Sequence, residues 1–243
     1  RVIDPHEGRD RTISITLQGI GKRYGFRWVL SGVSGFVNQG SVLGIGGPNG
    51  SGKSTVIKIV ADLIRPDVGS VSVRIGGDEL VGPERRALVG WVSPETGLYP
   101  ALSGAEHIAF FGELHGMALS PDDINQVLQR VGLAHRRNSS VASYSSGMQQ
   151  RLKYACAWVH GPAILLLDEP FMALDAEGVQ MVRKLVEGQR AHGVTIVAGN
   201  TEAELSLADT TIHLDSAGLM GVREPQAQPD GMTRVSPGGR VPE

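Results

Sequence analysis

Residues 47–54, GPNGSGKS, have the types and the spacing of a loop that holds phosphate groups. They fit the pattern G-x-x-x-x-G-K-[ST] at every specified position. The apolar run 42–45 precedes them as an expected buried strand, and residues 56–60 follow as a helix. Glycines let backbone N–H groups turn inward around phosphates, and the start of a helix adds partial positive charge. The sequence therefore predicts a nucleoside triphosphate site formed by Gly47, Pro48, Asn49, Gly50, Ser51, Gly52, Lys53, Ser54 and Thr55.

Three side chains of this phosphate loop have separate expected roles. Lys53 would contact the β- and γ-phosphates, the Ser54 hydroxyl would bind Mg²⁺, and Thr55 would lie near the α-phosphate. A dinucleotide-binding motif fits less well, because a match that begins at Gly44 places Asn49 at its third glycine. We therefore expect Lys53 to act in catalysis and Ser54 to act as a metal ligand.

An acidic pair follows a second apolar run. Residues 163–167, AILLL, are typical of a strand buried on both faces, and Asp168 and Glu169 come directly after them. An acid at the carboxyl end of such a strand would stand beside the phosphate loop. Asp168 would hold Mg²⁺, and Glu169 would polarise the attacking water as a catalytic residue. A pair of solvated acids at a strand end is the plain alternative.

The segment SYSSGMQQRLKYA, residues 143–155, resembles the signature sequence of ATP-binding cassette (ABC) ATPases. A turn of small residues at the start of a helix is an anion site. It cannot easily serve the nucleotide of its own chain, so Ser145 and Gly147 are expected to cap the nucleotide of a second subunit. An ordinary serine-capped helix is the alternative. A GTPase is disfavoured, because the chain lacks the guanine-specifying Asn-Lys-x-Asp motif.

The resemblance to the ABC family covers about residues 13–219 and implies further site residues. Tyr24 matches the aromatic residue that stacks on adenine, and Asp175 lies in the loop that crosses the dimer interface. Residues 90–100 match the segment that normally carries a glutamine for Mg²⁺, and residues 198–202 match the switch loop near the γ-phosphate. The resemblance thus implies ATP and Mg²⁺ as ligands.

Several positions depart from the family pattern. Ser146 replaces a signature glycine, Met148 replaces a glutamine, and Pro94 stands where the glutamine of the 90–100 segment belongs, with Glu95 as the nearest substitute. Asn200 stands where a histidine normally contacts the γ-phosphate. We expect Asn200 to be a weakened catalytic sensor and hydrolysis to be slow. The alternative is that Asn200 only caps a helix beginning near Thr201.

The resemblance implies an α/β fold of the P-loop NTPase class, with a RecA-like core, an antiparallel β subdomain and an inserted α-helical subdomain. The expected divisions are an N-terminal tail at 1–11, a nucleotide-binding domain at 12–221 with its helical part at about 96–158, and a disordered tail at 222–243. Sequence patterns predict strands at 13–17, 28–37, 42–45, 71–75, 163–167, 195–198 and 211–214. They predict helices at 103–115, from 120, at 149–159 and at 176–191.

Composition narrows the function classes further. A formal net charge of −2 gives no basic field that would attract nucleic acid. The single cysteine, Cys156, excludes an internal disulfide framework. No apolar run approaches the roughly 18 residues of a membrane span. The histidines show no metal-ligand spacing, and His107, His115 and His192 are expected on helix surfaces.

The resemblance also implies partners. We expect a cytoplasmic ATPase that is peripheral at the inner face of the membrane through an integral membrane transporter subunit. A second copy or a homologous ATPase would complete a dimer, and residues 93–111 would dock on the membrane subunit. The signature wording and the run 97–100 resemble exporter-type subunits, including those of cytochrome c maturation haem exporters. A catalytically weak regulatory subunit and a non-transport ABC ATPase are the alternatives.

Overall fold

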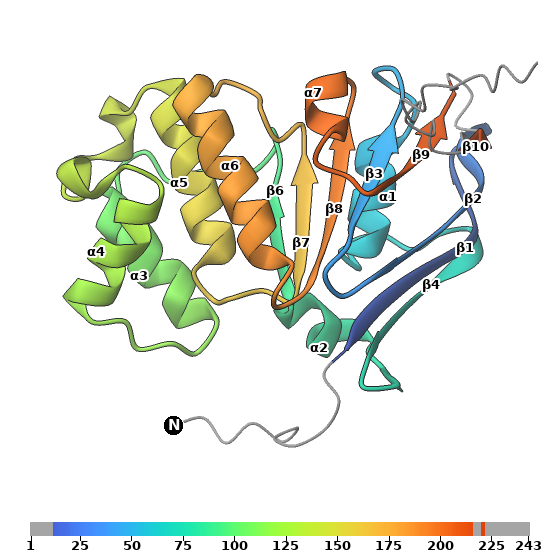
Figure 1. Ribbon diagram of the computed structural model, residues 1–243, viewed down its shortest axis with the longest axis horizontal. Coiled ribbons are helices and arrows are strands. Elements are labelled where there is room, and N and C mark those ends of the chain that lie inside the picture. The colour runs from blue at the N-terminus through green and yellow to red at the C-terminus, as the bar shows by residue number, and fades with distance from the viewer. Residues whose placement is uncertain (1–11, 216–219, 222–243) are drawn as a thin grey trace, which may run out of the picture.

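The structure is a computed structural model that describes residues 12–215 and 220–221. It contains a six-stranded sheet with the order β10-β9-β3-β8-β7-β6 and a four-stranded sheet with the order β2-β1-β4-β5. The tails predicted at 1–11 and 222–243 lie outside the described residues. Figure 1 shows the helices α3, α4 and α5 at one end of the molecule and the four-stranded sheet at the other.

The larger sheet contains the strands predicted at 42–45, 163–167, 195–198 and 211–214, together with β6 and β10, which the sequence patterns did not predict. Its parallel members are β3 (Val42–Gly46), β6 (Val89–Val92), β7 (Ile164–Asp168), β8 (Val194–Gly199) and β9 (Thr210–Leu214). The short strand β10 (Met220–Gly221) pairs antiparallel with β9 at the edge. Because β3, β7 and β8 run in the same direction, the segments that follow them meet at one edge of the sheet.

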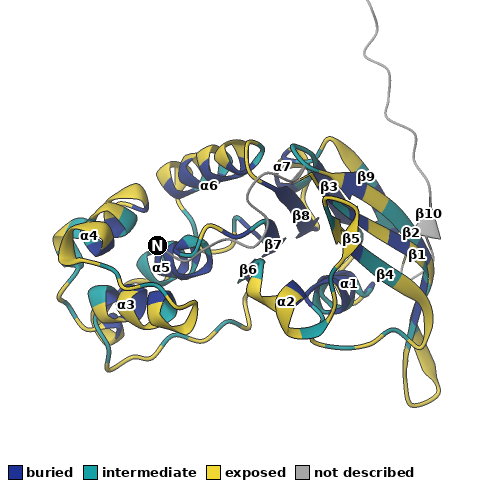
Figure 2. Ribbon diagram, turned by 90° about the horizontal axis from the view of Figure 1, so that it is seen from below, coloured by how far each residue is buried: buried dark blue, intermediate teal, exposed yellow. Residues whose placement is uncertain are grey.

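The two faces of this sheet take alternate residues of β7. Leu165 and Leu167 belong to a core formed with the helical end of the molecule, and Ile164 and Leu166 belong to a core shared with α1 and the smaller sheet. Both cores need apolar contacts, which explains why residues 163–167 are apolar throughout. In Figure 2, β7 and β8 are buried while the outer surfaces of α4 and α6 are exposed.

The smaller sheet is antiparallel, and its strands β1 and β2 are longer than the sequence predicted. It consists of β1 (Ile13–Tyr24), β2 (Arg27–Asn38), β4 (Val68–Ile75) and β5 (Asp78–Glu79). Register shifts interrupt the pairing of β1 with both neighbours, so the alternation of residues 13–17 is lost beyond residue 18 although the strand continues.

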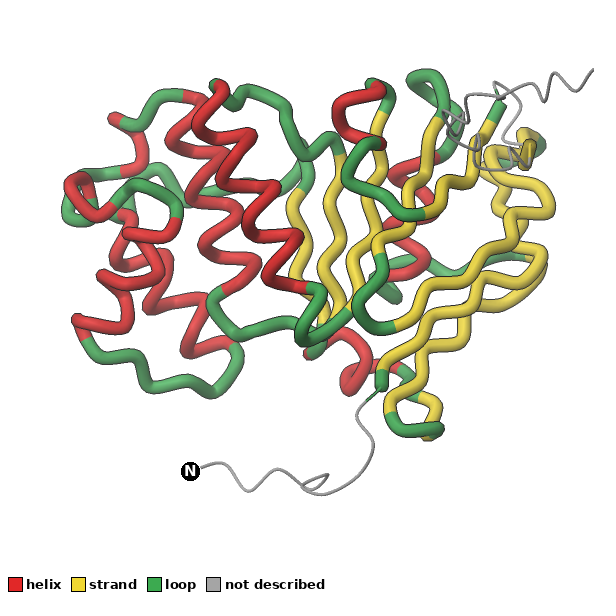
Figure 3. Tube along the Cα trace, in the orientation of Figure 1, coloured by secondary structure: helices red, strands yellow, loops and turns green. Residues whose placement is uncertain are grey.

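The helices are α1 (Lys53–Val60), α2 (Gly82–Ala87), α3 (Gly104–Leu114), α4 (Pro121–Arg130), α5 (Ser146–Trp158), α6 (Ala176–Gln189) and α7 (Glu202–Leu205). The capping box predicted at Ser103 is present, and Ser120 forms a second one with Asp123. Figure 3 shows that helices and strands occupy largely separate regions. Within the described ranges, no helix combines the length and the apolar character needed to cross a bilayer.

One surface prediction is wrong. His107 is fully buried in α3, because its ring is held by backbone groups on both sides. The Tyr99 N–H donates to His107 Nε2 at 3.0 Å, and His107 Nδ1 lies 2.9 Å from the Ser103 carbonyl. His115, the C-cap of α3, is exposed as expected, and His192 is exposed but lies in the turn after α6 rather than on the helix.

Candidate nucleotide site

The phosphate loop joins the end of β3 to the start of α1 and closes tightly on itself. Gly47, Gly50 and Gly52 all have positive φ, at 150°, 80° and 98°. A Cβ built on Gly47 would lie 2.7 Å from Ser51 Oγ, and one on Gly52 would lie 2.9 Å from the Val29 carbonyl. Gly47 and Gly52 are therefore required both for backbone conformation and for space, whereas Gly50 is favoured by its backbone conformation alone.

Lys53 and Ser51 give this loop its chemistry. The Lys53 side chain is only 5% exposed, and its Nζ donates to the carbonyls of Gly47 at 2.8 Å and Pro48 at 3.0 Å. The ammonium is thus held over the loop. The Ser51 hydroxyl is buried and has no hydrogen-bond partner among the described residues. A cationic group and an unsatisfied hydroxyl beside the N-terminus of α1 fit a phosphate ligand.

The predicted acid pair lies beside this loop. Asp168 ends β7 and is 4% exposed, and α1 packs against β7. Burial raises the pKa of the Asp168 carboxyl, while hydrogen bonding from Ser54 and the charge of Lys53 act against that rise. Ser54 and Asp168 together offer the oxygen ligands that Mg²⁺ prefers, so the donor set fits this ion.

Glu169 has an unusual backbone conformation. Its φ is +50°, one of three positive values among the described non-glycine residues. Its N–H donates to the Ala198 carbonyl at the end of β8, at 2.9 Å. This turn directs the chain out of β7 and toward the loop that ends at the N-cap of α6.

The switch loop contacts the phosphate loop directly. Asn200 Nδ2 donates to Asn49 Oδ1 at 2.9 Å. The N-cap of α7 is Thr201, whose hydroxyl accepts the Glu204 N–H at 3.2 Å, so the alternative that Asn200 caps this helix is wrong. The buried Glu204 carboxylate accepts the N–H groups of both Asn200 and Thr201 and fixes the loop in place.

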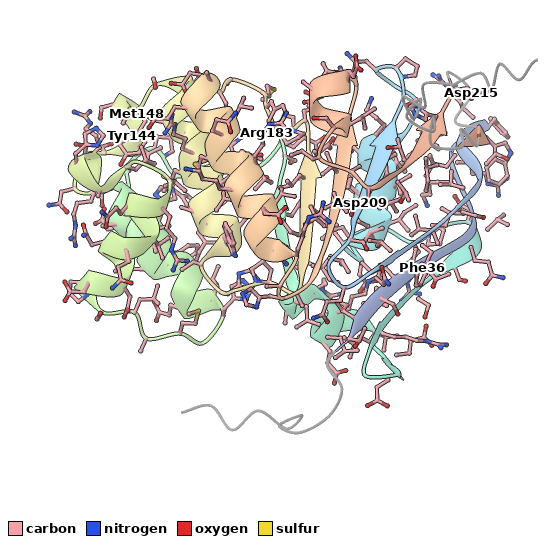
Figure 4. The ribbon with its side chains drawn as sticks, in the orientation of Figure 1. Phe36, Tyr144, Met148, Arg183, Asp209 and Asp215 are labelled. Carbon is pink, nitrogen blue, oxygen red and sulfur yellow. The ribbon has the colours of Figure 1, made fainter. Side chains whose placement is uncertain are left out.

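The signature segment begins α5 on the far side of β7 and β8 from the phosphate loop (Figure 1). Ser145 is the N-cap of α5, and its hydroxyl accepts the Met148 N–H at 3.2 Å. Ser145, Gly147 and Asp175 line one surface pocket of about 530 Å³. Figure 4 places the Met148 side chain at this end of the molecule, near the start of α5. Ser145 therefore caps α5, as the alternative interpretation expected, and also lines an open surface pocket.

The Asp175 carboxylate makes hydrogen bonds within its own chain that the sequence did not indicate. Asp175 is the N-cap of α6, and its carboxylate accepts from the Gly178 N–H and from Arg151 Nη2, both at 2.8 Å. The Gly178 N–H and the Arg151 guanidinium lower the pKa of the Asp175 carboxyl, in that order. Its first role in this chain is to hold the start of α6 against α5.

Tyr24 and Glu95 come from different elements near the phosphate loop. Tyr24 ends β1 with a ring that is 54% exposed, in a hairpin whose second strand contacts the phosphate loop near Gly52. Glu95 Oε2 pairs with Lys58 Nζ of α1 at 2.7 Å, and its charge adds to the raised pKa of Asp168. Pro94 has no side-chain donor, but its carbonyl accepts from Lys153 Nζ at 3.3 Å.

Sequence reasoning missed two groups that the structure places around these residues. Glu204 holds the switch loop, and Tyr154 of α5 donates to the carbonyl of Pro170, the residue after Glu169, at 2.7 Å. The Thr201-to-Glu204 spacing of a capping box could have indicated the first. No local pattern indicates the second, because 16 residues separate the partners.

Comparisons with known proteins found a matching family and several relatives of this chain. The family described as ABC transporter matches residues 30–172. The linearmycin resistance ATP-binding protein LnrL of Bacillus subtilis (strain 168) is 30% identical over 185 residues, covering 74% of this chain and 58% of that protein. The lantibiotic transport ATP-binding protein SrtF of Streptococcus pyogenes is 33% identical over 183 residues, covering 75% of this chain and 78% of that protein.

A solved structure of an ATP-binding subunit of an ABC transporter has a TM-score of 0.73 and 27% identity, covering 85% of this chain and 87% of that one. This similarity confirms the predicted fold class. The chain spans between 54% and 59% of the length of the first three curated relatives that it matches.

Proposed function

We propose that this chain, which belongs to the ABC transporter family, is an exporter-type ATP-binding subunit that hydrolyses ATP with Mg²⁺ to drive an integral membrane transporter subunit. One observation carries the proposal: Lys53, Asp168 and Glu169 lie at the same edge of the parallel sheet. Lys53 brings a cation, Asp168 a buried carboxylate beside Ser54, and Glu169 a second carboxylate next to them.

The residues divide the reaction between them. Lys53 exchanges the carbonyls of Gly47 and Pro48 for the β- and γ-phosphates of ATP. Glu169 accepts a proton from a water molecule as that water attacks the γ-phosphorus, and the bond from this phosphorus to the bridging oxygen breaks to give ADP and phosphate. Mg²⁺, held at Ser54 and Asp168, would neutralise charge on the phosphates. Asn200 supplies a neutral hydrogen bond rather than a cation at the γ-phosphate side.

The signature segment supports a dimer. Ser145 and Gly147 line an open pocket at the start of α5, which packs on one face of β7, whereas α1, the helix that follows the phosphate loop of the same chain, packs on the other face. A second ATPase subunit, identical or homologous, would place its own nucleotide in this pocket. Tyr24 would stack on the adenine of the nucleotide in its own chain, because its ring is exposed at the edge of the site.

An exposed apolar patch supports docking on a membrane subunit. Tyr99, Phe110 and Leu114 are 55%, 37% and 64% exposed, and the rings of Tyr99 and Phe110 contact each other edge to face with centroids 5.8 Å apart. The partner would hold this chain at the inner face of the membrane. Crosslinks from the intact complex should include residues 93–111, and crosslinks that avoid the whole segment contradict this assignment.

The direction of transport is proposed to be export. The names of two relatives concern resistance to linearmycin and transport of a lantibiotic. The closer similarity to cytochrome c maturation haem exporters stays a prediction. A catalytically weak regulatory subunit is the second candidate, favoured by Ser146, Met148, Pro94 and Asn200.

Steady-state phosphate release separates these candidates. The purified chain should release phosphate from Mg-ATP slowly, and Glu169→Gln should reduce the rate by at least about a hundredfold, in the range expected for a general base. Glu187→Gln, on the exposed side of α6, is the matched control and should keep the wild-type rate. A wild-type rate equal to that of Glu169→Gln, in isolation and with the membrane partner, contradicts the ATPase proposal and favours the regulatory one.

A further inference from the structure

One face of α5 lies along the loop that follows the acid pair. Gly147, Arg151 and Tyr154 are spaced by four and three residues, which places them on the same side of the helix. A Cβ on Gly147 would lie 3.1 Å from the Ala173 carbonyl, Arg151 Nη2 donates to Asp175 Oδ1 at 2.8 Å, and the Tyr154 hydroxyl donates to the Pro170 carbonyl at 2.7 Å. The helix that begins with the signature segment therefore contacts residues 170–175 at three points.

The contact made by Tyr154 is the most enclosed of the three. The side chain is 2% exposed, and its hydroxyl meets the carbonyl of the residue directly after Glu169. Burial, and then the charge of Glu204, raise the pKa of the Tyr154 hydroxyl, so this group stays protonated and can only act as a donor to the carbonyl. Arg151 and Asp175 are instead joined at the surface, where the Asp175 side chain is 70% exposed.

The backbone that Tyr154 holds is strained. Glu169 has a φ of +50° and Ala173 a φ of +59°, a conformation that residues with a Cβ rarely adopt. Such residues persist only where the surroundings fix them. The Glu169 N–H donates to the Ala198 carbonyl, and the Glu169 carbonyl accepts the Met172 N–H within the turn at 3.1 Å. Pro170 has no N–H to donate, so its carbonyl is the next main-chain group at which a side chain from another element can anchor the turn.

We propose that Tyr154 is a positioning residue for Glu169: its hydroxyl, through the Pro170 carbonyl, holds the left-handed turn that aims the Glu169 carboxylate at the attacking water. The proposal rests on the proposed function, because it takes Glu169 as the base. It also connects the two halves of the site. A shift of α5, when a second subunit's nucleotide occupies the Ser145 pocket, would be passed to Glu169 along the face formed by Gly147, Arg151 and Tyr154.

Two variants separate positioning from general packing. Tyr154→Phe removes the hydroxyl and keeps the ring. Gln189→Met is the matched control, because Gln189 Nε2 donates to another buried proline carbonyl, that of Pro162, also at 2.7 Å, before the opposite end of β7. Both variants leave one buried carbonyl without its donor, so both should lose stability to a similar extent.

The first measurement is amide hydrogen exchange by mass spectrometry on the nucleotide-free chain. Tyr154→Phe should speed exchange selectively in residues 168–174, whereas Gln189→Met should leave that peptide at the wild-type rate. The second is ATP turnover: Tyr154→Phe should lower kcat by about two- to tenfold with an unchanged KM, as expected for the loss of one hydrogen bond, and Gln189→Met should keep the wild-type kcat.

Each result decides the proposal. Wild-type exchange in residues 168–174 of Tyr154→Phe overturns it, as does equal acceleration in both variants or an unchanged kcat despite faster local exchange. If wild type and Glu169→Gln turn over ATP equally, the proposed function fails and the base-positioning role falls with it. Selective exchange would then still identify Tyr154 as the anchor of the turn, which distinguishes the two failures.

Discussion

The Asn200 carboxamide donates to Asn49 Oδ1 at 2.9 Å and so joins the switch loop after β8 to the phosphate loop after β3. The two residues are 151 positions apart in the chain, and both side chains are exposed at the carboxyl edge of the sheet. Asn200 is therefore placed to exchange its bond with Asn49 for one with a terminal phosphate. Thr201, not Asn200, caps α7.

This relationship predicts that Asn200 affects rate rather than stability. Asn200→Ala should lower the ATP turnover rate by about tenfold through the loss of one hydrogen bond to phosphate. The melting temperature and the ATP affinity should barely change. Thr201→Ala is the control, and it should lower the melting temperature while sparing the turnover rate. Loss of the N-cap costs about 1 kcal/mol of stability, or about 2–4 °C in melting temperature. Calorimetry and turnover assays on both variants check this, and an Asn200→Ala variant with wild-type turnover contradicts the sensor role.

Nucleotide affinity should depend on Lys53. Its ammonium is already held at the phosphate loop by the Gly47 and Pro48 carbonyls, so little reorganisation is needed when phosphate replaces them. Isothermal titration should detect no Mg-ATP binding to Lys53→Ala, while the exposed Lys184→Ala on α6 keeps the wild-type affinity. Equal affinities in the two variants would exclude the phosphate loop as the binding site.

Asp168 should lower the stability of the nucleotide-free protein at neutral pH. Burial raises its folded-state pKa above the usual 3.8, so the charged form is disfavoured by folding. This cost is absent below about pH 3.8 and grows as the pH rises through the folded-state pKa. Asp168→Asn should therefore melt at a higher temperature than wild type at pH 7, by about 2–4 °C for each kcal/mol relieved, and the gain should shrink as the pH falls.

Asp209 is the control, because its carboxyl should affect the stability of the folded protein in the opposite direction to Asp168. A two-point pair with Arg190, at 2.7 and 2.9 Å, lowers the pKa of its carboxyl, so this group contributes stability above about pH 3.8 that is lost at lower pH. Asp209→Asn should melt below wild type at pH 7. Melting temperatures of both variants at pH 7 check the two signs, and melting curves that extend below pH 3.8 check the loss of the Asp209 contribution in acid. A lower melting temperature for Asp168→Asn at pH 7 would refute the predicted cost.

His160 should make the protein sensitive to mild acid. Its ring stacks on that of His115 with centroids 3.6 Å apart, and burial, then the charge of His115, lowers the pKa of His160 to about 4. A depressed pKa contributes stability above about pH 6.5 that is lost as the pH falls toward 4. His160→Phe keeps an aromatic ring there and should flatten the decline in melting temperature across this window, whereas the exposed His192→Asn should follow wild type. Parallel curves for wild type and His160→Phe contradict this.

The sequence was sufficient for the strands that are buried on both faces and for the capped helices. Residues 163–167 are apolar because they pack in two cores, one on each face of the sheet. Ser103 and Ser120 mark the starts of their helices, because each forms a capping box with a residue three positions later. The six-residue helix α2 escaped detection, since its sequence GPERRA has no apolar periodicity. What anchors it is tertiary: the buried Arg85 guanidinium donates to the carbonyls of Ile59 and Val60 at the end of α1.

The same distinction applies to the site. The phosphate loop and the acid pair could be predicted because their chemistry requires fixed residue types at fixed spacing. The hydrogen bonds that hold these two segments in place could not be predicted from the sequence. Tyr154 reaches the Pro170 carbonyl and Asn200 reaches Asn49 only because α5, β7, β8 and β3 are packed together in the folded chain. His107 looked like a surface residue for the same reason, since its partners become visible only when the backbone of Tyr99 is placed.

We expect ATP to join two chains by lying between Lys53 of one chain and the Ser145–Gly147 turn of the other. Glu169→Gln should retain ATP while blocking its hydrolysis, so light scattering in Mg-ATP should give twice the 25.8 kDa mass of the chain. The double variant Lys53→Ala/Glu169→Gln should remain at the single mass under the same conditions. If Glu169→Gln binds ATP by titration yet keeps the single-chain mass at every concentration, the proposal that ATP lies between two chains is contradicted.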